Sequence, residues 1–503
     1  MVADVVVVGA GPSGLTLASE LAIGGVRPIV LERRTGTIES RAGTVLPRVL
    51  ELFDARGAAD RIIRKTREIY DFPFRDNHIY AGLRSVDWRN INSRFGFTLM
   101  IPQNATEDVL VQWAREKGVD IRYGMTVDDI HAAGDGFEVT ATESGGGRHV
   151  FSARYVVGAD GARSIVRKSA NLPFEGHDGT FRGIVADAHL QCPFAEGHGG
   201  ADNEYGWTRG FAFGPGITRF NIVHEKQRHV AKDAPVTVQE VAACLRDILG
   251  TDYGITSFRW ASRFDDTMRC VPALREGNIF LVGESARIHY PASGVGMNFC
   301  IQDAFNLGWK LAAVVKGHAD PSLLDTYQAE RMPVIRDLLE SVKAQVAMQF
   351  NFSHEGVALK RHFEEEHLSQ PGLNRKIGLE LNGIARPYAG PAGCHALTGL
   401  PVPDFDLVLP TGEQTRVGEL LRAQNFLLLD LRGSGAFDKL ALGGLPVRIA
   451  KALPVRLLAE HRGLTALLVR PDAYVAWASE QRADAKEAVA QIANWLRVPT
   501  QVH

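Results

Sequence analysis

Residues 2–14 read VADVVVVGAGPSG, and this stretch decides the fold. The run before Gly9 is short and rich in valine, which favours a buried parallel strand. From Ser13 to Ile23, apolar side chains fall near one helical face, and two glycines follow to end the helix. Residues 28–32 (PIVLE) then predict a second strand. The order strand, tight turn, helix, strand predicts the opening of an α/β nucleotide-binding fold.

The glycines of the turn fit the GxGxxG pattern of dinucleotide-binding proteins. Gly9 permits the turn, Gly11 lets the backbone approach a pyrophosphate, and Gly14 lets the helix pack on the strand. Ser13 lies at the start of the helix, whose free amides attract phosphate. Glu32 follows Gly14 by 18 residues, where its carboxylate can accept both hydroxyls of a ribose. The alternative is a glycine-rich turn beside an unrelated acid, and the pattern alone does not separate NAD from FAD.

The bulk composition is that of an ordinary soluble protein of 503 residues. Lysine and arginine total 56 against 58 acidic residues, so no basic excess exists to attract nucleic acid or an anionic membrane. The five cysteines are widely spaced and include no CxxC pair, which favours free thiols and gives no sign of a metal site. We therefore expect a cytoplasmic protein that binds neither nucleic acid nor membrane.

Further along the chain, helix-like and strand-like patterns alternate. A helix is expected from about Thr106 to Lys117, with Asn104 or Thr106 as its cap. The segment 175–269 has short strand-like runs and many aromatic residues, and it predicts an antiparallel sheet that carries a pocket. The other expected elements are strands at 137–142, 149–157 and 279–282, a helix at 298–316, a helix opened by Pro321, a linker at 382–403, and strands at 426–431 and 464–469.

Three further segments carry a family resemblance. They are Gly158 to Ser164 with the Asp160-Gly161 pair, Ser40-Arg41 with Arg48, and the long stretch from Asn278 to Lys310. Ile101-Pro102-Gln103, just before a helix, also matches. Together they make the chain resemble the class A flavoprotein monooxygenases, the para-hydroxybenzoate hydroxylase fold group. Within that group it is most similar to the aromatic polyketide hydroxylases, and the resemblance covers nearly the whole chain.

This resemblance implies FAD as the cofactor and a set of residues that bind it. It also implies an α/β fold with a Rossmann-like FAD-binding domain (1–175 and 275–385), a middle mixed-sheet substrate domain (176–274, joined by part of 70–103), and a C-terminal thioredoxin-like domain (395–503). The implied cofactor-binding residues are Gly9, Gly11, Ser13, Gly14, Glu32, Arg33, Arg41, Gln103, Asp160, Glu284, Gly296, Met297 and Asn298.

The sequence departs from the family pattern at three places in the second FAD segment. The usual Gly-Asp is Gly283-Glu284, the common Ala-His is Ala286-Arg287, and the usual Gly-Gly-Gln-Gly is 293–296, SGVG. We expect these changes to cluster around the flavin ring. Backbone amides of the loop from Pro291 to Asn298 can still bond the ring. Two interpretations stay open, harmless drift within a working hydroxylase or a changed reaction on the same cofactor.

The reaction implied by the resemblance uses NADPH or NADH, O2 and a flavin C4a-hydroperoxide to hydroxylate a polycyclic aromatic polyketide. Pro291, Gly294 and His289 are the residues predicted beside the reacting ring. Candidate walls of the substrate pocket are Tyr205, Trp207, Phe211, Phe213 and Phe220, although a place in the plain sheet core is as good an interpretation for each. Asn221 and His224 should lie on opposite faces of their strand.

Other functions remain open from the sequence. One is a different step on a polyketide, such as ring-opening oxygenation, dehydration or reduction, and another is inactivation of an aromatic antibiotic. A third is a flavin-free relative that only binds a pathway intermediate. Cys394 stands alone at the border of the last domain, so thiol–disulfide chemistry is not expected there. A homodimer is left open.

Overall fold

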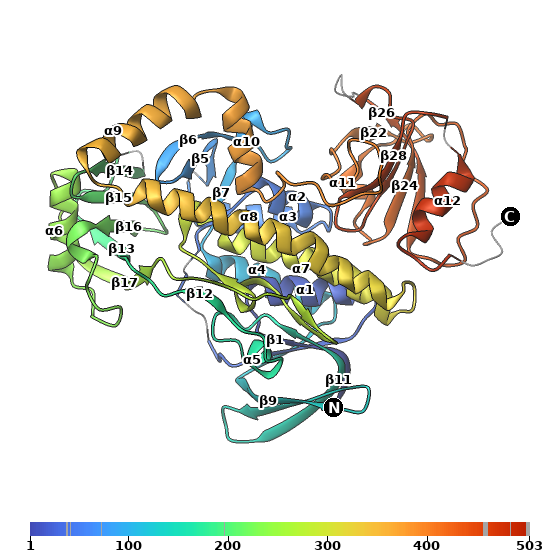
Figure 1. Cartoon of the computed structure of the whole chain (residues 1–503), viewed down its shortest axis with the longest axis horizontal. Coiled ribbons are helices and arrows are strands. Elements are labelled where there is room, and N and C mark those ends of the chain that lie inside the picture. Colours follow the sequence, from blue (N-terminus) through green and yellow to red (C-terminus); the bar gives the residue numbers. More distant parts are fainter. Residues whose placement is uncertain are drawn as a thin grey trace.

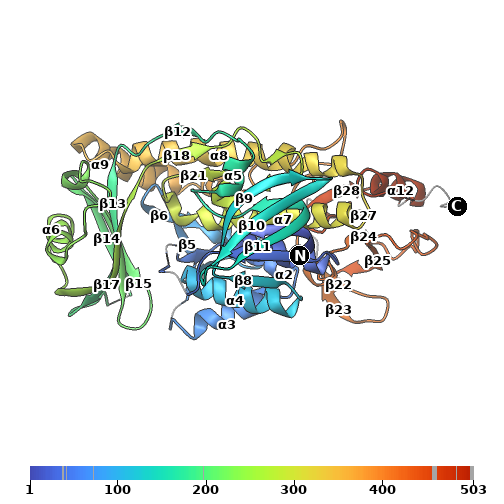
Figure 2. The same cartoon turned by 90° about the horizontal axis from the view of Figure 1, so that it is seen from below.

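A computed structural model describes the chain except for residues 37–38, 41, 72, 196, 456–460, 483 and 499–503, and it leaves the side chains of 84 and 85 undescribed. The molecule is elongated, with a helix-covered antiparallel sheet at one end and the C-terminal sheets at the other (Figure 1). Between them lies a central sheet with helices packed on it. The turned view shows the same order along the long axis (Figure 2).

The central sheet contains the first predicted strand. Its strand order is β19-β20-β11-β1-β2-β8, and β10 and β9 extend it from β11. β1 pairs in parallel with both β2 and β11, and Val5, Val6 and Val7 are fully buried between them. The strands span Val2–Val8 (β1), Pro28–Glu32 (β2), Asp120–Tyr123 (β8), Met125–Ala133 (β9), Gly136–Glu143 (β10), Arg148–Gly158 (β11), Arg275–Glu276 (β19) and Ile279–Leu281 (β20).

Helices pack on this sheet, and the first of them, α1, contacts both α4 and α7. The long helix α8 crosses the molecule beside α7 (Figure 1). These helices span Pro12–Ile23 (α1), Pro47–Asp54 (α2), Ala59–Arg67 (α3), Gln103–Glu116 (α4), Ile165–Ser169 (α5), Gly296–Val315 (α7) and Asp325–Gln349 (α8). The 3-10 turn at Pro321–Leu324 leads directly into α8, as the proline suggested.

The middle sheet has five antiparallel strands in the order β14-β15-β16-β13-β17. These pairs confirm the antiparallel sheet expected for residues 175–269. Parallel and antiparallel pairs occur together in the central sheet instead. One face is covered by α6, Val238–Leu249, a helix that the strand-like pattern did not predict. The strands span Arg182–Leu190 (β13), His198–Asn203 (β14), Gly206–Ala212 (β15), Thr218–His224 (β16) and Ile255–Asp265 (β17).

Small sheets join the central and middle sheets. Two of them have three strands each, in the orders β3-β7-β4 and β12-β18-β21, and β5 and β6 form a separate hairpin. Their strands span Thr44–Val45 (β3), Phe74–Arg75 (β4), Asn77–Tyr80 (β5), Leu83–Asp87 (β6), Thr98–Met100 (β7), Glu175–His177 (β12), Met268–Cys270 (β18) and Arg287–Ile288 (β21). Helices α9 (His354–His362) and α10 (Pro371–Leu381), with a π-helical turn at Phe363–Leu368 between them, complete this part.

The C-terminal part holds two sheets, with strand orders β23-β22-β26 and β25-β24-β27-β28. β24 runs parallel to β25 and antiparallel to β27. The elements are Asp406–Val408 (β22), Gln414–Arg416 (β23), Val417–Leu420 (α11), Phe426–Asp430 (β24), Val447–Lys451 (β25), Leu453–Pro454 (β26), Ala466–Val469 (β27), Val475–Ser479 (β28) and Ala485–Ala493 (α12). The thioredoxin-like shape of this part stays a prediction.

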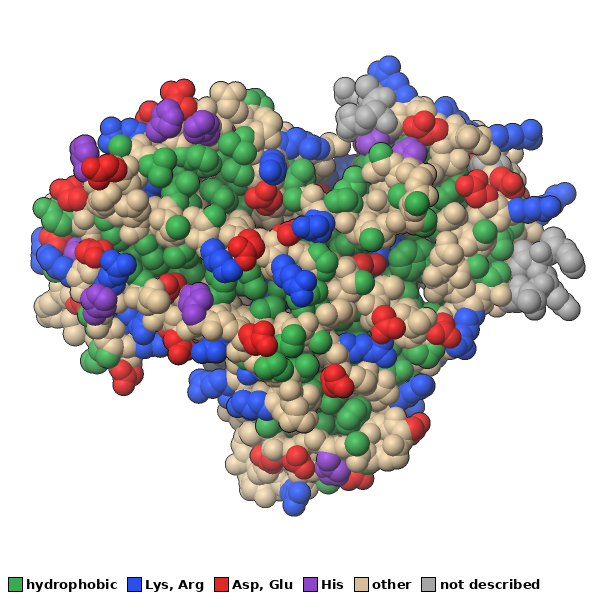
Figure 3. Space-filling view, in the orientation of Figure 1, with side chains coloured by type: hydrophobic (Ala, Val, Ile, Leu, Met, Phe, Trp, Pro, Cys, Tyr) green, Lys and Arg blue, Asp and Glu red, His purple; other side chains and the backbone are tan. Residues whose placement is uncertain are grey.

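Two helix starts differ from the predictions. α4 begins at Gln103 with Pro102 at its N-cap, so the helix opens before the expected start and neither Asn104 nor Thr106 caps it. α7 begins at Gly296, two residues before the expected start. In the part of the chain that the structure describes, no helix is long and apolar enough to cross a membrane. On the face shown in Figure 3, acidic and basic side chains are interspersed, with no field of a single charge.

Candidate functional site

In the turn between β1 and α1, two of the three glycines lie against other main-chain atoms and the third has open space beside it. A Cβ on Gly9, whose φ is +105°, would overlap the main-chain oxygen of Ala159, and one on Gly14 would overlap that of Gly9. A Cβ on Gly11 would meet no atom within 4 Å. α1 begins at Pro12 without a side-chain cap, so its first amides are available to a ligand. The close contacts at Gly9 and Gly14 agree with roles in the turn and in helix packing, and the approach of a pyrophosphate to Gly11 stays a prediction.

Glu32, at the end of β2, is hydrogen-bonded to the turn between β1 and α1. Its Oε2 accepts the amide of Ala10 at 2.7 Å, and its Oε1 accepts the amide of Arg34 at 2.9 Å. Burial opposes ionisation of this carboxyl, but the Arg34 guanidinium and the two amides outweigh it and lower the pKa of Glu32. Arg33 is exposed, while Arg34 reaches back to the main-chain oxygen of Ala10 at 3.3 Å. The sequence predicted Arg33 instead of Arg34, although the two-residue spacing from Glu32 could have indicated Arg34.

Gln103 holds the segment that leads away from this edge of the sheet. Its Oε1 accepts the amide of Ala42 at 3.3 Å, and its Nε2 donates to Glu107 at 2.9 Å. Its own amide donates to Ser40 Oγ. Arg41 lies outside the described residues, so its predicted contact with the cofactor stays a prediction. The residues on either side of it are fixed by Gln103.

Asp160 follows β11 and lies against the glycine turn. A Cβ on Gly9 would come within 3.1 Å of the Asp160 Cα. Asp160 Oδ2 accepts the amide of Ile165 at 2.7 Å, at the start of α5. Asp160 Oδ1 is buried and meets no hydrogen-bond partner among the described residues. Burial raises the pKa of this carboxyl. A buried acceptor without a donor is costly, and a donor from a bound ligand would satisfy it.

The departures at 284 and 287 have different surroundings. Glu284 is exposed on a short 3-10 turn, and a Cβ on the preceding Gly283 would lie 3.0 Å from Ser13 Oγ. Arg287 is 1% exposed and pairs with Asp303 of α7 in the core. The expectation that all three departures surround the flavin ring is therefore wrong for Arg287, because its charge is neutralised inside the domain.

Residues 291–298 are called the ring-side loop here because the sequence predicts the flavin ring beside them, and they lead from the end of β21 into the first turn of α7. Asn298 Oδ1 accepts the amide of Leu46 at 2.8 Å, and Asn298 Nδ2 donates to the main-chain oxygen of Thr44 at 3.2 Å. Thr44 in turn donates to the main-chain oxygen of Gly294 at 3.3 Å. These bonds hold the loop against β3 and bring Gly294 and Asn298 to the same strand.

The first turn of α7 contains Gly296 and Met297 and has no side-chain cap, so its amide donors are free of intrahelical partners. His289 packs beside it, with Nδ1 donating to the main-chain oxygen of Tyr290 at 2.7 Å. Burial lowers the pKa of His289 to about 4, so the ring is neutral at physiological pH. The neutral ring keeps Nε2 as an acceptor. Pro291, two residues after His289, has a φ of −72°.

The middle sheet presents a mixed aromatic and polar face opposite α6. Phe220 lies on the α6 side in the sheet core, so its assignment as a pocket wall is wrong, and Tyr205 is 44% exposed. The side chains of Trp207 and Phe213 reach Gly82 and Gly43 of the other part of the molecule. Strand alternation places Phe211 on the same face as Trp207. His224 bonds Asp247 of α6. Asn221, three residues earlier on the same strand, lies on the opposite face, as strand alternation predicted.

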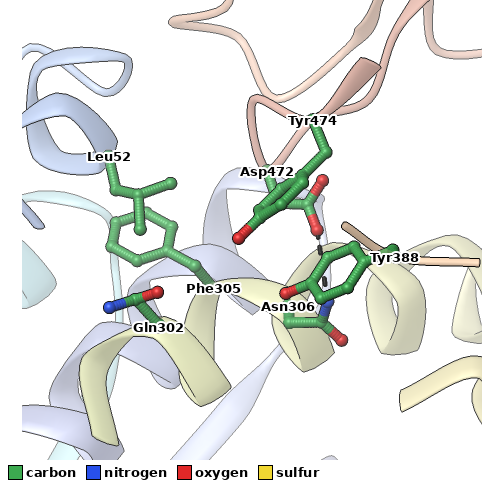
Figure 4. Close-up of a pocket in the computed structure, with 7 residues that line it drawn as sticks. All are labelled: Leu52, Gln302, Phe305, Asn306, Tyr388, Asp472 and Tyr474. Atoms are coloured by element: carbon green, nitrogen blue, oxygen red, sulfur yellow. Dashed lines mark hydrogen bonds between the residues drawn. The ribbon is translucent and has the colours of Figure 1, made fainter. Parts of the chain in front are cut away.

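A small cavity lies elsewhere, where the C-terminal part docks on α7 (Figure 4). Its volume is about 10 Å³, space for a single water. Asn306 donates to Asp472 across it, and Arg48 donates to the main-chain oxygens of Asp472 and Ala473 at 3.1 and 3.2 Å. This junction excludes a substrate. It lies behind the ring-side loop, at the middle of α7.

The residues present fit FAD. The open side of Gly11 leaves room for a pyrophosphate, Asp160 Oδ1 lacks a donor, and α7 opens with uncapped amides. Glu32 lies at the end of β2, and its contact with a ribose stays a prediction. Within the described ranges no group of three or more His, Cys, Asp or Glu side chains is arranged to hold a metal ion.

Comparison with known families assigns most of the chain. The FAD binding domain family matches residues 2–342, and the family described as aromatic-ring hydroxylase, C-terminal, matches residues 395–499.

Individual relatives match along the whole chain. The chain is 34% identical to a 12-dehydrotetracycline 5-monooxygenase/anhydrotetracycline 6-monooxygenase of Streptomyces rimosus, with 99% of both chains covered. It is also 34% identical to a dialkyldecalin synthase of Streptomyces rugosporus, over 95% of this chain and 96% of that one. Among solved structures, the OxyS anhydrotetracycline hydroxylase from Streptomyces rimosus superposes with a TM-score of 0.89 at 33% identity, covering 99% of this chain and 100% of that one.

Proposed function

This chain belongs to the FAD-dependent aromatic-ring monooxygenases, and we propose that it hydroxylates a polycyclic aromatic polyketide with O2 and NADPH or NADH. One structural observation carries the proposal. The segment after Ser40 contacts two surfaces at once, because a Cβ on Gly43 would lie 2.9 Å from the Phe213 ring and Thr44 donates to Gly294. The aromatic face of the middle sheet therefore lies next to the ring-side loop, and a flat apolar substrate fits between them.

FAD, when bound, supplies the two-electron carrier and the activation of O2. The chain's own residues have simpler tasks. We propose that Gly11, Ser13 and the first amides of α1 bind the pyrophosphate, and that Glu32 binds the ribose. The amides at Gly296 and Met297 would orient the ring. Trp207, Phe211 and Phe213 would exclude water from the face where the substrate lies.

We propose that a larger cleft is the entrance to this face. It has a volume of about 430 Å³ and is lined by Arg67, Tyr70, Asp71, Pro73 and Phe74. The amide of Met100 donates to the main-chain oxygen of Pro73, so the cleft lies at the outer edge of the β3-β7-β4 sheet. The other edge of that sheet, β3, holds the ring-side loop. A cleft of this size accommodates a drug-sized ring system.

The deciding experiment measures oxygen transfer. Purified protein, reconstituted with FAD, is incubated under 18O2 with NADPH or NADH and a panel of polycyclic phenols that includes polyketide intermediates and finished antibiotics. Hydroxylation predicts product with one 18O atom and one nicotinamide oxidised per product. A preference for intermediates would support a biosynthetic role and a preference for antibiotics an inactivating one. Turnover of every phenol in the panel without label would refute hydroxylation.

A second candidate is a step without oxygen insertion. It is favoured by the similarity to a dialkyldecalin synthase together with Val295 in the position that usually holds glutamine in the family. The same assay separates the two. Product formed anaerobically without nicotinamide would establish the second function, while strict dependence on O2 would exclude it.

A further inference from the structure

Ser293 adopts a backbone conformation that serine rarely takes. Its φ and ψ are +52° and 11°, in the left-handed region, in the middle of the ring-side loop. Only glycine enters this region freely, so the surrounding structure must hold a serine there. The main-chain oxygen and the side-chain hydroxyl of Ser293 both form hydrogen bonds, and their partners come from two different elements.

The first partner is His78 of β5. His78 Nε2 lies 2.6 Å from the main-chain oxygen of Ser293, and Nδ1 lies 2.9 Å from Thr98 Oγ1. Trp88 donates its indole N–H to the same Thr98 hydroxyl at 2.7 Å. Because the main-chain oxygen of Ser293 can only accept, Nε2–H donates to it, and Nδ1 of the neutral ring then accepts the Thr98 hydrogen. Every member of this buried chain is satisfied.

The second partner is Gln345 of α8. Its Oε1 accepts the Ser293 hydroxyl at 2.6 Å and also the amide of Ala81 at 3.1 Å. Ala81 is itself a left-handed residue, with φ of +50°, at the tip of the β5–β6 hairpin. One side-chain oxygen thus holds two residues that would otherwise avoid their conformations.

The hairpin is also fastened to the middle sheet. The main-chain oxygen of Gly82, next to Ala81, accepts Trp207 Nε1 at 3.3 Å and Arg209 Nη2 at 2.8 Å. A Cβ on Gly82 would collide with the Trp207 indole. The hairpin therefore connects the substrate-side sheet to the ring-side loop through short, buried contacts.

We propose that His78 and Gln345 are positioning residues that hold Ser293 left-handed and so fix the ring-side loop in the shape that receives the flavin ring. The inference rests on the placement of the flavin ring at residues 291–298 proposed above. Neither residue needs to touch FAD. They act through the peptide that precedes Gly294 and the uncapped start of α7.

The test compares His78→Leu with His78→Gln, which can keep a donor to Ser293 and an acceptor for Thr98. The matched control is His224→Leu, because His224 is equally buried and hydrogen-bonded but faces α6. FAD affinity is measured by titrating apo-protein, together with the absorbance spectrum of the bound flavin and the melting temperature of the apo-protein. Gln345→Met tests the same idea from the other side of Ser293.

His78→Leu is expected to weaken FAD binding about tenfold or more and to shift the flavin spectrum, since it leaves a buried carbonyl unpaired. His78→Gln should stay within about threefold of the wild type, because its amide can replace both bonds. His224→Leu should lower the melting temperature without changing FAD affinity. Ser293→Gly added to His78→Leu should recover part of the affinity, because glycine needs no clamp.

Unchanged FAD affinity in both His78→Leu and Gln345→Met would overturn the inference, as would an equal loss in His224→Leu. All of these measurements are made without substrate. A protein that hydroxylates no polyketide can still show the expected losses, so failure of the proposed function and failure of this inference are distinguishable.

Discussion

Arg219 of β16 donates a hydrogen bond of 2.6 Å to the main-chain oxygen of Ser40, which attaches the middle sheet to the segment leading into the FAD site. The same guanidinium bonds Asp187 at 2.6 and 2.8 Å and lies 3.6 Å over the Phe213 ring. Arg219 and Asp187 are 2% and 0% exposed, so this ion pair is buried. Arg219 therefore links the geometry of the substrate face to the anchoring of Ser40.

Replacing Arg219 with leucine is expected to destabilise the protein strongly. Among the described residues, the change leaves the buried Asp187 with the partly exposed Arg259 as its remaining ion-pair partner. Breaking a buried pair by removing one member costs on the order of 3–5 kcal/mol. Urea denaturation measures the free energy of unfolding.

The control is Asp187→Asn combined with Arg219→Leu, which removes the uncompensated charge. It should recover part of the lost stability, because the penalty comes from the unpaired carboxylate. If the single variant loses less than about 1 kcal/mol, the pair contributes no more than a surface salt bridge and the anchoring role is refuted.

Gly11→Ala and Gly14→Ala separate cofactor contact from packing. Gly11 has φ of −75° and open space where a Cβ would be, so alanine fits the fold but intrudes on the pyrophosphate. We expect an unchanged apo melting temperature and FAD binding weakened about a hundredfold, roughly the effect of losing 3 kcal/mol. Gly14→Ala should instead destabilise the apo-protein, since its Cβ would overlap the Gly9 oxygen. FAD affinity retained in Gly11→Ala would place the phosphates elsewhere.

The parts of the site that a local pattern encodes could be predicted from the sequence. β1, β2 and the roles of Gly9, Gly11 and Gly14 follow from a short run of residues whose spacing is their physical cause. Arg34 was not predicted, although it follows Glu32 by two residues, a spacing that puts two side chains on the same side of an extended chain.

Other features depend on contacts between distant segments. His78 and Ser293 are 215 positions apart, and no sequence motif at either residue indicates a contact with the other. The inward turn of Arg287 depends on Asp303, which lies on the next helix. Helix α6 was not predicted, because the aromatic and glycine-rich residues around it gave the whole segment a strand-like pattern. Side-chain partners chosen by packing leave no periodic signal in the chain.

The buried histidine at 78 predicts a dependence of stability on pH. Burial lowers the pKa of His78 from 6.5 to about 4, because the charged ring is disfavoured there. Above pH 6.5 the ring is neutral in both states and the contribution to stability is fully present. As the pH falls toward 4, only the unfolded chain takes up the proton, so stability is lost, in total about 3 kcal/mol.

His78→Gln should remove this loss because glutamine does not titrate. The measurement is the free energy of unfolding at several pH values between 7 and 4, taken as the difference between the variant and the wild type so that other groups cancel. Parallel curves for the two proteins would mean that His78 titrates normally in the folded state.

The two faces of the middle sheet give the last prediction, made with two phenylalanines. Phe211 lies on the face toward the ring-side loop by strand alternation, whereas Phe220 is fully buried against α6. Phe211→Ala should raise KM for a polycyclic substrate about tenfold, because a stacked aromatic wall of roughly 1.5 kcal/mol is lost, while the free energy of unfolding changes little. Phe220→Ala should cost about 3–5 kcal/mol of stability through a core cavity, with KM unchanged for the protein that remains folded. Steady-state kinetics and urea denaturation on both variants check the pair, and a KM effect in Phe220→Ala without one in Phe211→Ala would mean that the substrate lies on the α6 side of the sheet.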